Sequence, residues 1–479
     1  MEPLYRLLRC LASAELCYRS VVQTTDERSL EQGLHRELTA GQMAMVAVGG
    51  SIGTGLLLGS AAAIEVAGPA VVLTFLFAAF VTWTVALALG ELAPLHPSAG
   101  SFQRYGDLYL NEWAGFLSGA GYWAAIAISI GTEMVASATY IAFWFPGVPA
   151  IVWVALASLL LLGVNVLSVG RYGRFEYWFA MIKVVVIAAF IVLGAALMAG
   201  GRTAAQYTAQ GGLFPNGALA TLLAVPFALY TFSGVEFVAV TSGEARSTRD
   251  IARATRLTFV ILTLIYIGAI VVLTGVMPWN HAGVRESPFV TVFRTVDIPG
   301  AAHLMNFVVL TAALSGANAA LYSASRTLFA LARNGWAPAA LGRLNRAGSP
   351  TLAVVTSSFS VVVALALERW APQQAFVSIL NAALFGLLLS WLVTLASHVR
   401  FRRTVTDTQL AALPHRSPLG AAGSMIGFAL ITLAILKTWW DSRLSLASGV
   451  VYLIVLNVAF VISRRRRGQA SRPGLQRLR

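Results

Sequence analysis

The sequence predicts an all-α integral membrane protein with twelve transmembrane helices. Of its 479 residues, 57% are hydrophobic and only 11% are charged, and the mean hydropathy is +0.73. No soluble globular protein of this size has such a composition. About 20 apolar residues are needed to cross a bilayer. The apolar runs lie at 41–64, 69–93, 113–145, 149–168, 176–199, 219–242, 256–277, 300–332, 351–367, 373–398, 419–438 and 446–463.

The first span is interrupted near its middle by Gly49, Gly50, Ser51, Ile52, Gly53, Thr54 and Gly55. Four glycines in seven positions weaken a helix, and unwound backbone is tolerated in a bilayer only where it is buried in protein or lines a cavity. The half-helix after Thr54 would direct free N–H groups and its positive dipole end at an anion such as a carboxylate. The string therefore predicts a small-solute site, and the alternative is a packing surface of small residues.

The second and third spans each carry a carboxylate. Glu91, at the end of the second span, is expected to be structural. Glu133 lies midway along the third span, where an ionisable group is costly and suggests a function by default. We expect it to handle substrate or protons, and the alternative is a buried, hydrogen-bonded carboxyl that holds helices together. The third and eighth spans exceed thirty residues and must tilt or protrude.

The fifth span contains Lys183, one of only two lysines in the chain. The other, Lys437, lies near a helix end, where its long side chain can reach the interface. A lysine can lose its proton when desolvated, whereas an arginine effectively cannot. Lys183 is therefore the predicted proton-coupling group. The alternative is a permanent ammonium that acts as a fixed strut, with exchange or uniport in place of coupling.

The sixth span has its own break, at Phe232, Ser233, Gly234, Val235 and Glu236. It lies five spans after the first, so the two broken spans have opposite orientations, which is the pattern of an inverted-repeat transporter with a midplane site. Glu236 is expected either to handle protons or to cap N–H groups freed by the break. Glu244, at the cytoplasmic end of this span, is expected to pair with loop arginines as an inner gate or clamp.

Charge predicts the orientation. Of the 34 Lys and Arg residues, 26 lie on the side shared by both termini, five lie on the other side and three lie within spans. This asymmetry predicts cytoplasmic termini in a cell (inner) membrane and an even number of spans. The net charge of +14 then reflects topology and contact with anionic lipid, with no nucleic-acid partner. Three regions follow: a cytoplasmic tail at 1–38 that is disordered or a surface amphipathic helix, a transmembrane domain at 39–463, and a basic cytoplasmic tail at 464–479.

Enzyme, metal and cofactor motifs are not found in the sequence. The six His form no HExxH or HxxH pair within a span, both Cys lie in the N-terminal tail, and the glycine string precedes no Lys-Ser/Thr. A membrane-embedded transferase is the alternative from another class, and repeated pore-lining rings of a channel are lacking. We expect no metal and no cofactor other than a proton as the coupling ion. The oligomeric state is not predicted.

Several stretches carry a family resemblance. They are LTAGQMAMVAVGGSIGTGLLLGS (38–60), GELAPLHPSAGSFQRYGDLYLNEWAGFLSGAGYW (90–123), TEMVASATYIAFWFP (132–146), NVLSVGRYGRFEYWFAMIKV (165–184), YTFSGVEFVAVTSGEAR (230–246) and ALYSASRTLFALARNGWAP (320–338). Together they resemble the amino-acid transporter family of permeases in the amino acid–polyamine–organocation superfamily. The resemblance covers about 35–463, and it departs from the family pattern in the long N-terminal tail and in the loop after Glu244, which lacks the usual prolines.

The resemblance implies a LeuT-type fold, with two inverted five-helix repeats, two further helices, and breaks in helices 1 and 6. The substrate α-carboxylate is expected near Ser51, Thr54 and Gly55, and the α-ammonium near carbonyls of Gly49, Gly50, Phe232 and Ser233. Phe232 is expected to gate the site or simply to pack. In proton-coupled relatives a lysine at the Lys183 position replaces a sodium ion that joins helices 1 and 8, so we expect contacts with Gly49 and Ser315. A neutral, bulky or aromatic amino acid is the preferred substrate, with an exchanger or a cationic substrate as alternatives.

Overall fold

The computed structural model describes residues 36–166, 169–200, 204–208, 211–282, 287–295, 300–370, 375–411 and 413–470. Within that part of the chain the α-helices are α3 (Ala40–Ser51), α4 (Ser60–Ala67), α5 (Val71–Leu95), α6 (Ser101–Tyr109), α7 (Glu112–Ala142), α8 (Ala150–Asn165), α9 (Val169–Ala199), α10 (Ala218–Leu223), α11 (Val225–Thr231), α12 (Phe237–Val240), α13 (Thr248–Val276), α14 (Pro288–Thr295), α15 (Ala301–Arg333), α16 (Thr351–Ser358), α17 (Ser360–Trp370), α18 (Ala375–Thr404), α19 (Asp407–Ala411), α20 (Gly420–Asp441) and α21 (Arg443–Ala470). A π-helical turn, η1, covers Gly55–Gly59, and 3-10 turns cover Gly68–Ala70, Ala204–Tyr207, Thr241–Glu244, Trp279–His281 and Ala339–Gly342.

Eight helical stretches of the described chain are long and apolar enough to cross a membrane. One of them, Ala40–Leu95, is 56 residues long and turns at Gly68, directly before Pro69. Gly68 has a φ of +63°, a left-handed conformation that glycine adopts readily. Three shorter apolar helices lie at Ile151–Asn165, Ala218–Thr231 and Thr351–Val363. The chain is therefore an all-helical, multi-pass membrane protein. The expected tail at 1–38 lies almost wholly outside the described residues.

Polar caps set several helix starts. Thr39 and Gln42 form a reciprocal capping box at the start of α3. Asn111 accepts a hydrogen bond from the Ala114 N–H at the start of α7, and Ser247 does the same for Asp250 at α13. These caps give partners to N–H groups that the first turn of each helix leaves without an intrahelical acceptor.

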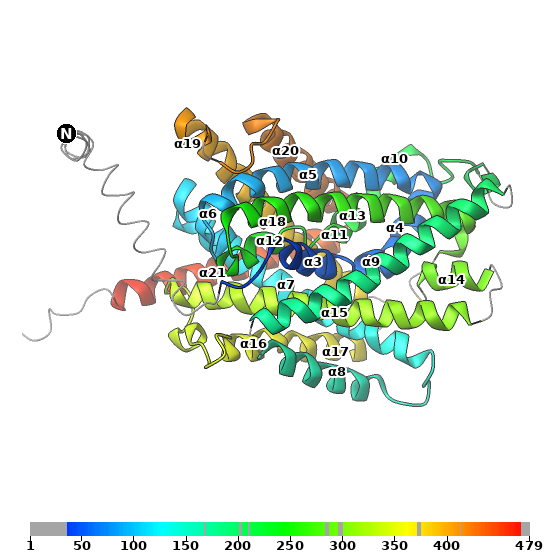
Figure 1. The fold of residues 1–479 in the computed structure, drawn as a ribbon, viewed down its shortest axis with the longest axis horizontal. Helices are drawn as coiled ribbons and strands as arrows, with labels where there is room; N and C mark the ends of the chain where they lie inside the picture. Colours follow the sequence, from blue (N-terminus) through cyan, green and yellow to red (C-terminus); the bar gives the residue numbers. More distant parts are fainter. Residues whose placement is uncertain are drawn as a thin grey trace, which may run out of the picture.

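The helices lie roughly parallel in one bundle (Figure 1), with α3 and α12 near its middle. The helix α6, the helix α19 and the C-terminal end of α21 lie at one end of the bundle, and α14 lies at the other. The final helix continues past the span expected at 446–463, through Arg464–Arg467, to Ala470. The first end is therefore the arginine-rich end.

Candidate functional site

The first apolar helix is discontinuous at the glycine string. The helix α3 ends at Ser51, and the π-helical turn begins at Gly55. Other helices approach the string closely, because a Cβ added to Gly50 would overlap the ring of Phe237 and one added to Gly53 would overlap the carboxylate of Glu133. Glycine is required here for close approach, so a side chain would separate the helices.

A second discontinuity lies directly against the first. The helix α11 ends at Thr231 and α12 begins at Phe237, and between them Gly234 takes a φ of +103°. A Cβ on Gly234 would lie 2.9 Å from the Ser51 N. The Thr231 hydroxyl donates to the Gly55 carbonyl oxygen at 3.0 Å. The two expected substrate-binding segments, far apart in sequence, therefore meet in the middle of the protein.

Lys183 of α9 contacts the carbonyl side of the first discontinuity. Its Nζ donates to the Ile52 carbonyl oxygen at 3.0 Å and to the Gly49 carbonyl oxygen. The side chain is 1% exposed. The contact with Gly49 is as expected from the sequence, but no hydrogen bond joins Lys183 to Ser315 in the described chain.

Glu133 of α7 contacts the amide side of the same discontinuity. Its carboxylate accepts the Thr54 N–H, at 3.0 and 3.1 Å to its two oxygens, and the Thr54 hydroxyl at 3.0 Å. The residue is 7% exposed. The Glu133 carboxylate thus occupies the Thr54 donors at which the sequence analysis expects a substrate carboxylate. Lys183 and Glu133 together place an ammonium on the carbonyls and a carboxylate on the amide of one helix break.

A third buried charge, Glu176 of α9, was missed from the sequence. It is fully buried, and it accepts hydrogen bonds from the Ser315 hydroxyl and, at 2.8 Å, from the Asn318 amide, both on α15. Glu176, with Glu133, interacts electrostatically with Lys183. Ser315 therefore joins α15 to α9 through Glu176 and not through Lys183 as expected. A signal was available, since Glu176 lies seven residues before Lys183 and so on the same helix face.

Two more of the predicted carboxylates, Glu236 and Glu244, have partners near the second discontinuity. Glu236 accepts the Gly234 N–H at 3.0 Å, which is the capping contact given as the alternative to a transport role. Glu244 pairs with Arg326 at 3.4 Å, and both side chains are 1% exposed. One partner of Glu244 is thus Arg326 of α15, an arginine within a span. Beside this pair the Leu38 N–H donates to the Glu244 carbonyl oxygen at 3.0 Å, so the start of α3 is fixed to the same loop.

The apolar members of the second discontinuity are packed. Phe232 is fully buried, with its ring centroid 4.9 Å from that of Tyr266 and 6.4 Å from that of Phe75. Val235 is also fully buried. In the described part of the chain, no group of three or more His, Cys, Asp or Glu side chains has the arrangement of a metal site.

Comparisons with known proteins show the family and the fold. Residues 42–467 match the family model described as "Amino acid permease". The chain is 34% identical to the Bacillus subtilis amino acid permease YtnA over 89% of this chain and 94% of the relative. It is 33% identical to the γ-aminobutyric acid permease of B. subtilis, over 91% of this chain and 95% of the relative. It is also 33% identical to the aromatic amino acid transport protein AroP of Escherichia coli K12, over 90% of this chain and 96% of the relative. A manganese transporter from Eremococcus coleocola has a similar fold, with a TM-score of 0.52 and 14% identity over 89% of this chain and 94% of that one.

Proposed function

The chain belongs to the amino acid permease family, and from that premise we propose that it imports an amino acid by proton-coupled symport with alternating access. The proposal takes the two helix discontinuities as the substrate site. It also takes the membrane to be the cell (inner) membrane, with both termini in the cytoplasm. An amino-acid exchanger is the alternative.

The proposed architecture is twelve spans, with two inverted five-helix repeats and two further helices. Twelve is the count when the 56-residue stretch is taken as two crossings and each shorter apolar helix as one. The discontinuities then fall in spans 1 and 6, at equivalent positions of the two repeats. The excess of arginine on one side supports the orientation.

One observation carries the proposed substrate site: the Glu133 carboxylate on the Thr54 N–H and hydroxyl. A substrate α-carboxylate would need the same donors, and two carboxylates cannot both ionise at such short range without a large electrostatic cost. Protonation of Glu133 would weaken its hold on Thr54 and remove that repulsion. Binding of the substrate carboxylate would therefore be coupled to uptake of a proton at this position.

Lys183 is the second proposed coupling group, and it acts on the other side of the break. Its protonated amine holds the Gly49 and Ile52 carbonyls. Loss of the proton to the cytoplasm would remove two charge-assisted hydrogen bonds and free α3 to move. Glu236 is the third candidate, because it is a fully buried carboxylate in the second break.

The proposed substrate is a neutral amino acid, bulky or aromatic. The names of relatives span γ-aminobutyric acid, threonine or serine, and aromatic amino acids. A cationic amino acid is the alternative. The α-ammonium would meet carbonyls near Gly50, Phe232 and Ser233, because Lys183 already holds that of Gly49.

The test is uptake into proteoliposomes with labelled phenylalanine, threonine and γ-aminobutyric acid, followed by competition with each of the twenty amino acids. An imposed pH step, acid outside, should drive accumulation of at least one of the three labels. Counterflow without any response to the pH step would favour the exchanger. No binding, uptake or counterflow of any amino acid would contradict the proposal.

A further inference from the structure

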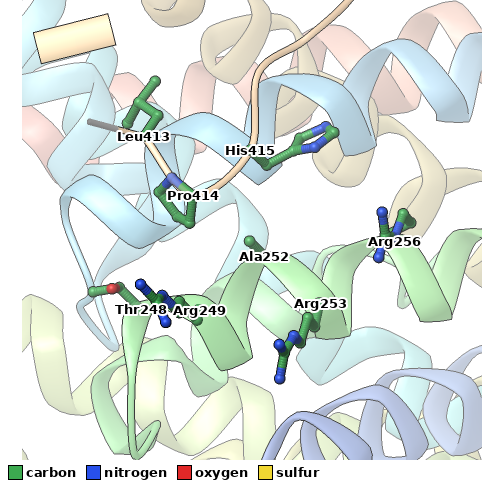
Figure 2. A pocket seen from close by; sticks show the side chains of 8 residues that line it. All are labelled: Thr248, Arg249, Ala252, Arg253, Arg256, Leu413, Pro414 and His415. Atoms are coloured by element: carbon green, nitrogen blue, oxygen red, sulfur yellow. The ribbon is translucent and has the colours of Figure 1, made fainter. Parts of the chain in front are cut away.

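A cationic cavity lies at the arginine-rich end of the bundle, away from the helix breaks. It has a volume of about 460 Å³ and lies between the first turns of α13 and the segment before α20. Arg249, Arg253 and Arg256 lie on one face of α13, and Leu413, Pro414 and His415 form the opposite side (Figure 2). In the part of the chain that the structure describes, no acidic side chain forms an ion pair with any of these three arginines.

An apolar cavity of about 300 Å³ continues from the cationic one. The two share Ala252, Arg256 and His415, and the apolar one extends between α5 and α13 along Trp83 and Phe259. Val260 at its edge is 46% exposed, so this cavity borders the apolar outer surface of the bundle. The two cavities therefore place positive charge at the end of α13 and a connected apolar cavity farther along the same helix.

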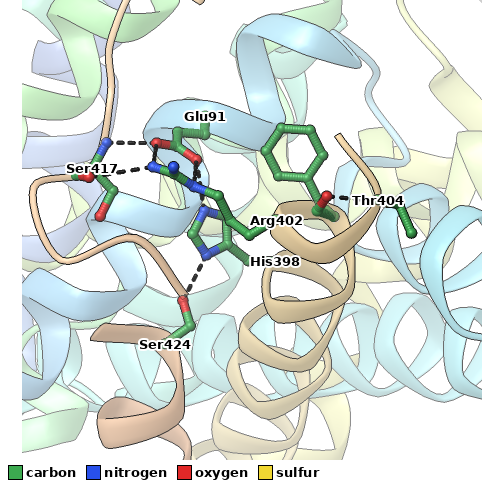
Figure 3. A network of polar contacts seen from close by, with 7 residues as sticks. Glu91, His398, Arg402, Thr404, Ser417 and Ser424 are labelled. Carbon is green, nitrogen blue, oxygen red and sulfur yellow. Dashed lines mark hydrogen bonds and ion pairs between the residues drawn. The ribbon is translucent and has the colours of Figure 1, made fainter. Parts of the chain in front are cut away.

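The wall opposite α13 is held in place by a buried polar network (Figure 3). Glu91 at the end of α5 accepts hydrogen bonds from Arg402, from the Ser417 N–H, and at 2.8 Å from His398. Arg402 also donates to the Ser417 carbonyl oxygen at 3.2 Å. Glu91 is thus paired within the network, so it does not neutralise the cavity arginines. Burial lowers the pKa of His415, and so does Arg256, while Glu91 raises it, which leaves His415 available as a neutral hydrogen-bonding group.

We infer that these two cavities form a binding site for an anionic phospholipid of the cytoplasmic leaflet. The phosphodiester lies among Arg249, Arg253 and Arg256, where guanidinium groups can donate in pairs to phosphate oxygens, and one acyl chain follows the apolar cavity beside Trp83. Basic pockets between helices on the cytoplasmic side suit anionic lipid headgroups. A soluble phosphate would use only the cationic half. The inference rests on the orientation given under the proposed function but not on transport.

Trp83 lines the apolar cavity and can report its occupancy. The experiment reconstitutes the full chain in phosphatidylcholine vesicles that contain small, equal mole fractions of either brominated phosphatidylglycerol or brominated phosphatidylcholine. The Trp83 signal is the difference in quenching between the wild type and Trp83→Phe. The expected result is stronger quenching of Trp83 by the brominated phosphatidylglycerol.

Two variants test the arginines. Arg253→Gln with Arg256→Gln should lower the preference for phosphatidylglycerol by roughly five-fold per arginine. Arg343→Gln with Arg346→Gln makes the same charge change at exposed sites on the same side. This control should leave the preference for phosphatidylglycerol unchanged. Ala252→Leu keeps every charge but narrows the junction of the cavities, and should also reduce Trp83 quenching.

Three outcomes would overturn the inference. Equal quenching of Trp83 by both brominated lipids would show that no headgroup is selected. If both arginine double variants lost the preference for phosphatidylglycerol equally, the preference would arise from general surface charge and not from this cavity. Removal of the preference by added inorganic phosphate would assign the arginines to a soluble anion. None of these readouts depends on uptake, so failure here is distinct from failure of the proposed transport.

Discussion

The replacement of Glu133 by glutamine tests whether its carboxylate and a substrate carboxylate compete for Thr54. Glu133 accepts two donors of Thr54, the N–H at 3.0 Å and the hydroxyl at 3.0 Å. Hydrogen bonds to a charged group contribute about 1.5–3 kcal/mol and neutral ones about 0.5–1.5 kcal/mol. Glutamine should therefore weaken the hold on the two donors by about 2 kcal/mol in total.

If the substrate must displace residue 133 from Thr54, the stronger hydrogen bonds of the glutamate oppose substrate binding by this difference in free energy. Glu133→Gln should then tighten substrate binding at least about tenfold, which corresponds to about 1.4 kcal/mol. Wild-type affinity should rise as the pH falls, because protonation neutralises Glu133, whereas the affinity of the variant should not depend on the protonation of this residue. The measurement is equilibrium binding of the labelled amino acid that the competition panel identifies, in detergent, over a series of pH values.

Glu176→Gln is the matched control. It removes another buried carboxylate near Lys183 that makes no contact with Thr54, so it should not tighten binding. Weaker binding in Glu133→Gln would refute the competition and indicate that Glu133 attracts the substrate ammonium. An unchanged pH dependence in that variant would assign the proton to another group.

Three further predictions follow from the contacts. Gly55→Leu should abolish uptake while the protein still inserts, because its Cβ would lie 3.1 Å from the Thr231 Cα; normal uptake alongside an unchanged membrane fraction would contradict the placement of the site. Lys183→Ala should retain at best amino-acid exchange that does not respond to a pH step, and Lys183→Arg should hold the protein in one conformation. Both are measured by substrate accumulation with and without an imposed pH step. Burial raises the pKa of Asp107 in α6 to about 7, although Arg104 lowers it. The folded state therefore keeps a proton between about pH 4 and 7 that the unfolded state loses, and stability should fall by up to about 1.4 kcal/mol per pH unit over that window. Asp107→Asn should flatten this slope in thermal unfolding, and an equal slope in the variant would contradict it.

Glycine patterns and apolar run lengths allowed much of the architecture to be predicted. The discontinuities at residues 52–54 and 232–236 follow from residues that form poor helices, and the all-helical, multi-pass membrane class follows from composition alone. Boundaries were less predictable: α9 starts seven residues before the expected 176, because aromatic and charged residues near a membrane surface remain helical without being apolar.

Side-chain partners were harder to predict than helices. The contact of Lys183 with Gly49 was expected from the family resemblance. The pairing of Ser315 with Glu176 was not expected, since Glu176 lies among aromatic residues that resemble an interfacial segment. The pairing of Glu244 with Arg326 was not expected either, because Arg326 comes from a distant span and sequence alone gives no interhelical register.

The two side chains that hold the first helix break also bear on the return of the empty carrier. A transporter that achieves net uptake must recross the membrane barrier without cargo, and exposed, unpaired backbone groups would make that step costly. Here the ammonium of Lys183 covers the Gly49 and Ile52 carbonyls, and the carboxylate of Glu133 covers the Thr54 amide. Under the proposed function, these two side chains would give the first break an internal counterpart of a zwitterion, which would lower the barrier to reorientation without substrate and favour net import over one-for-one exchange.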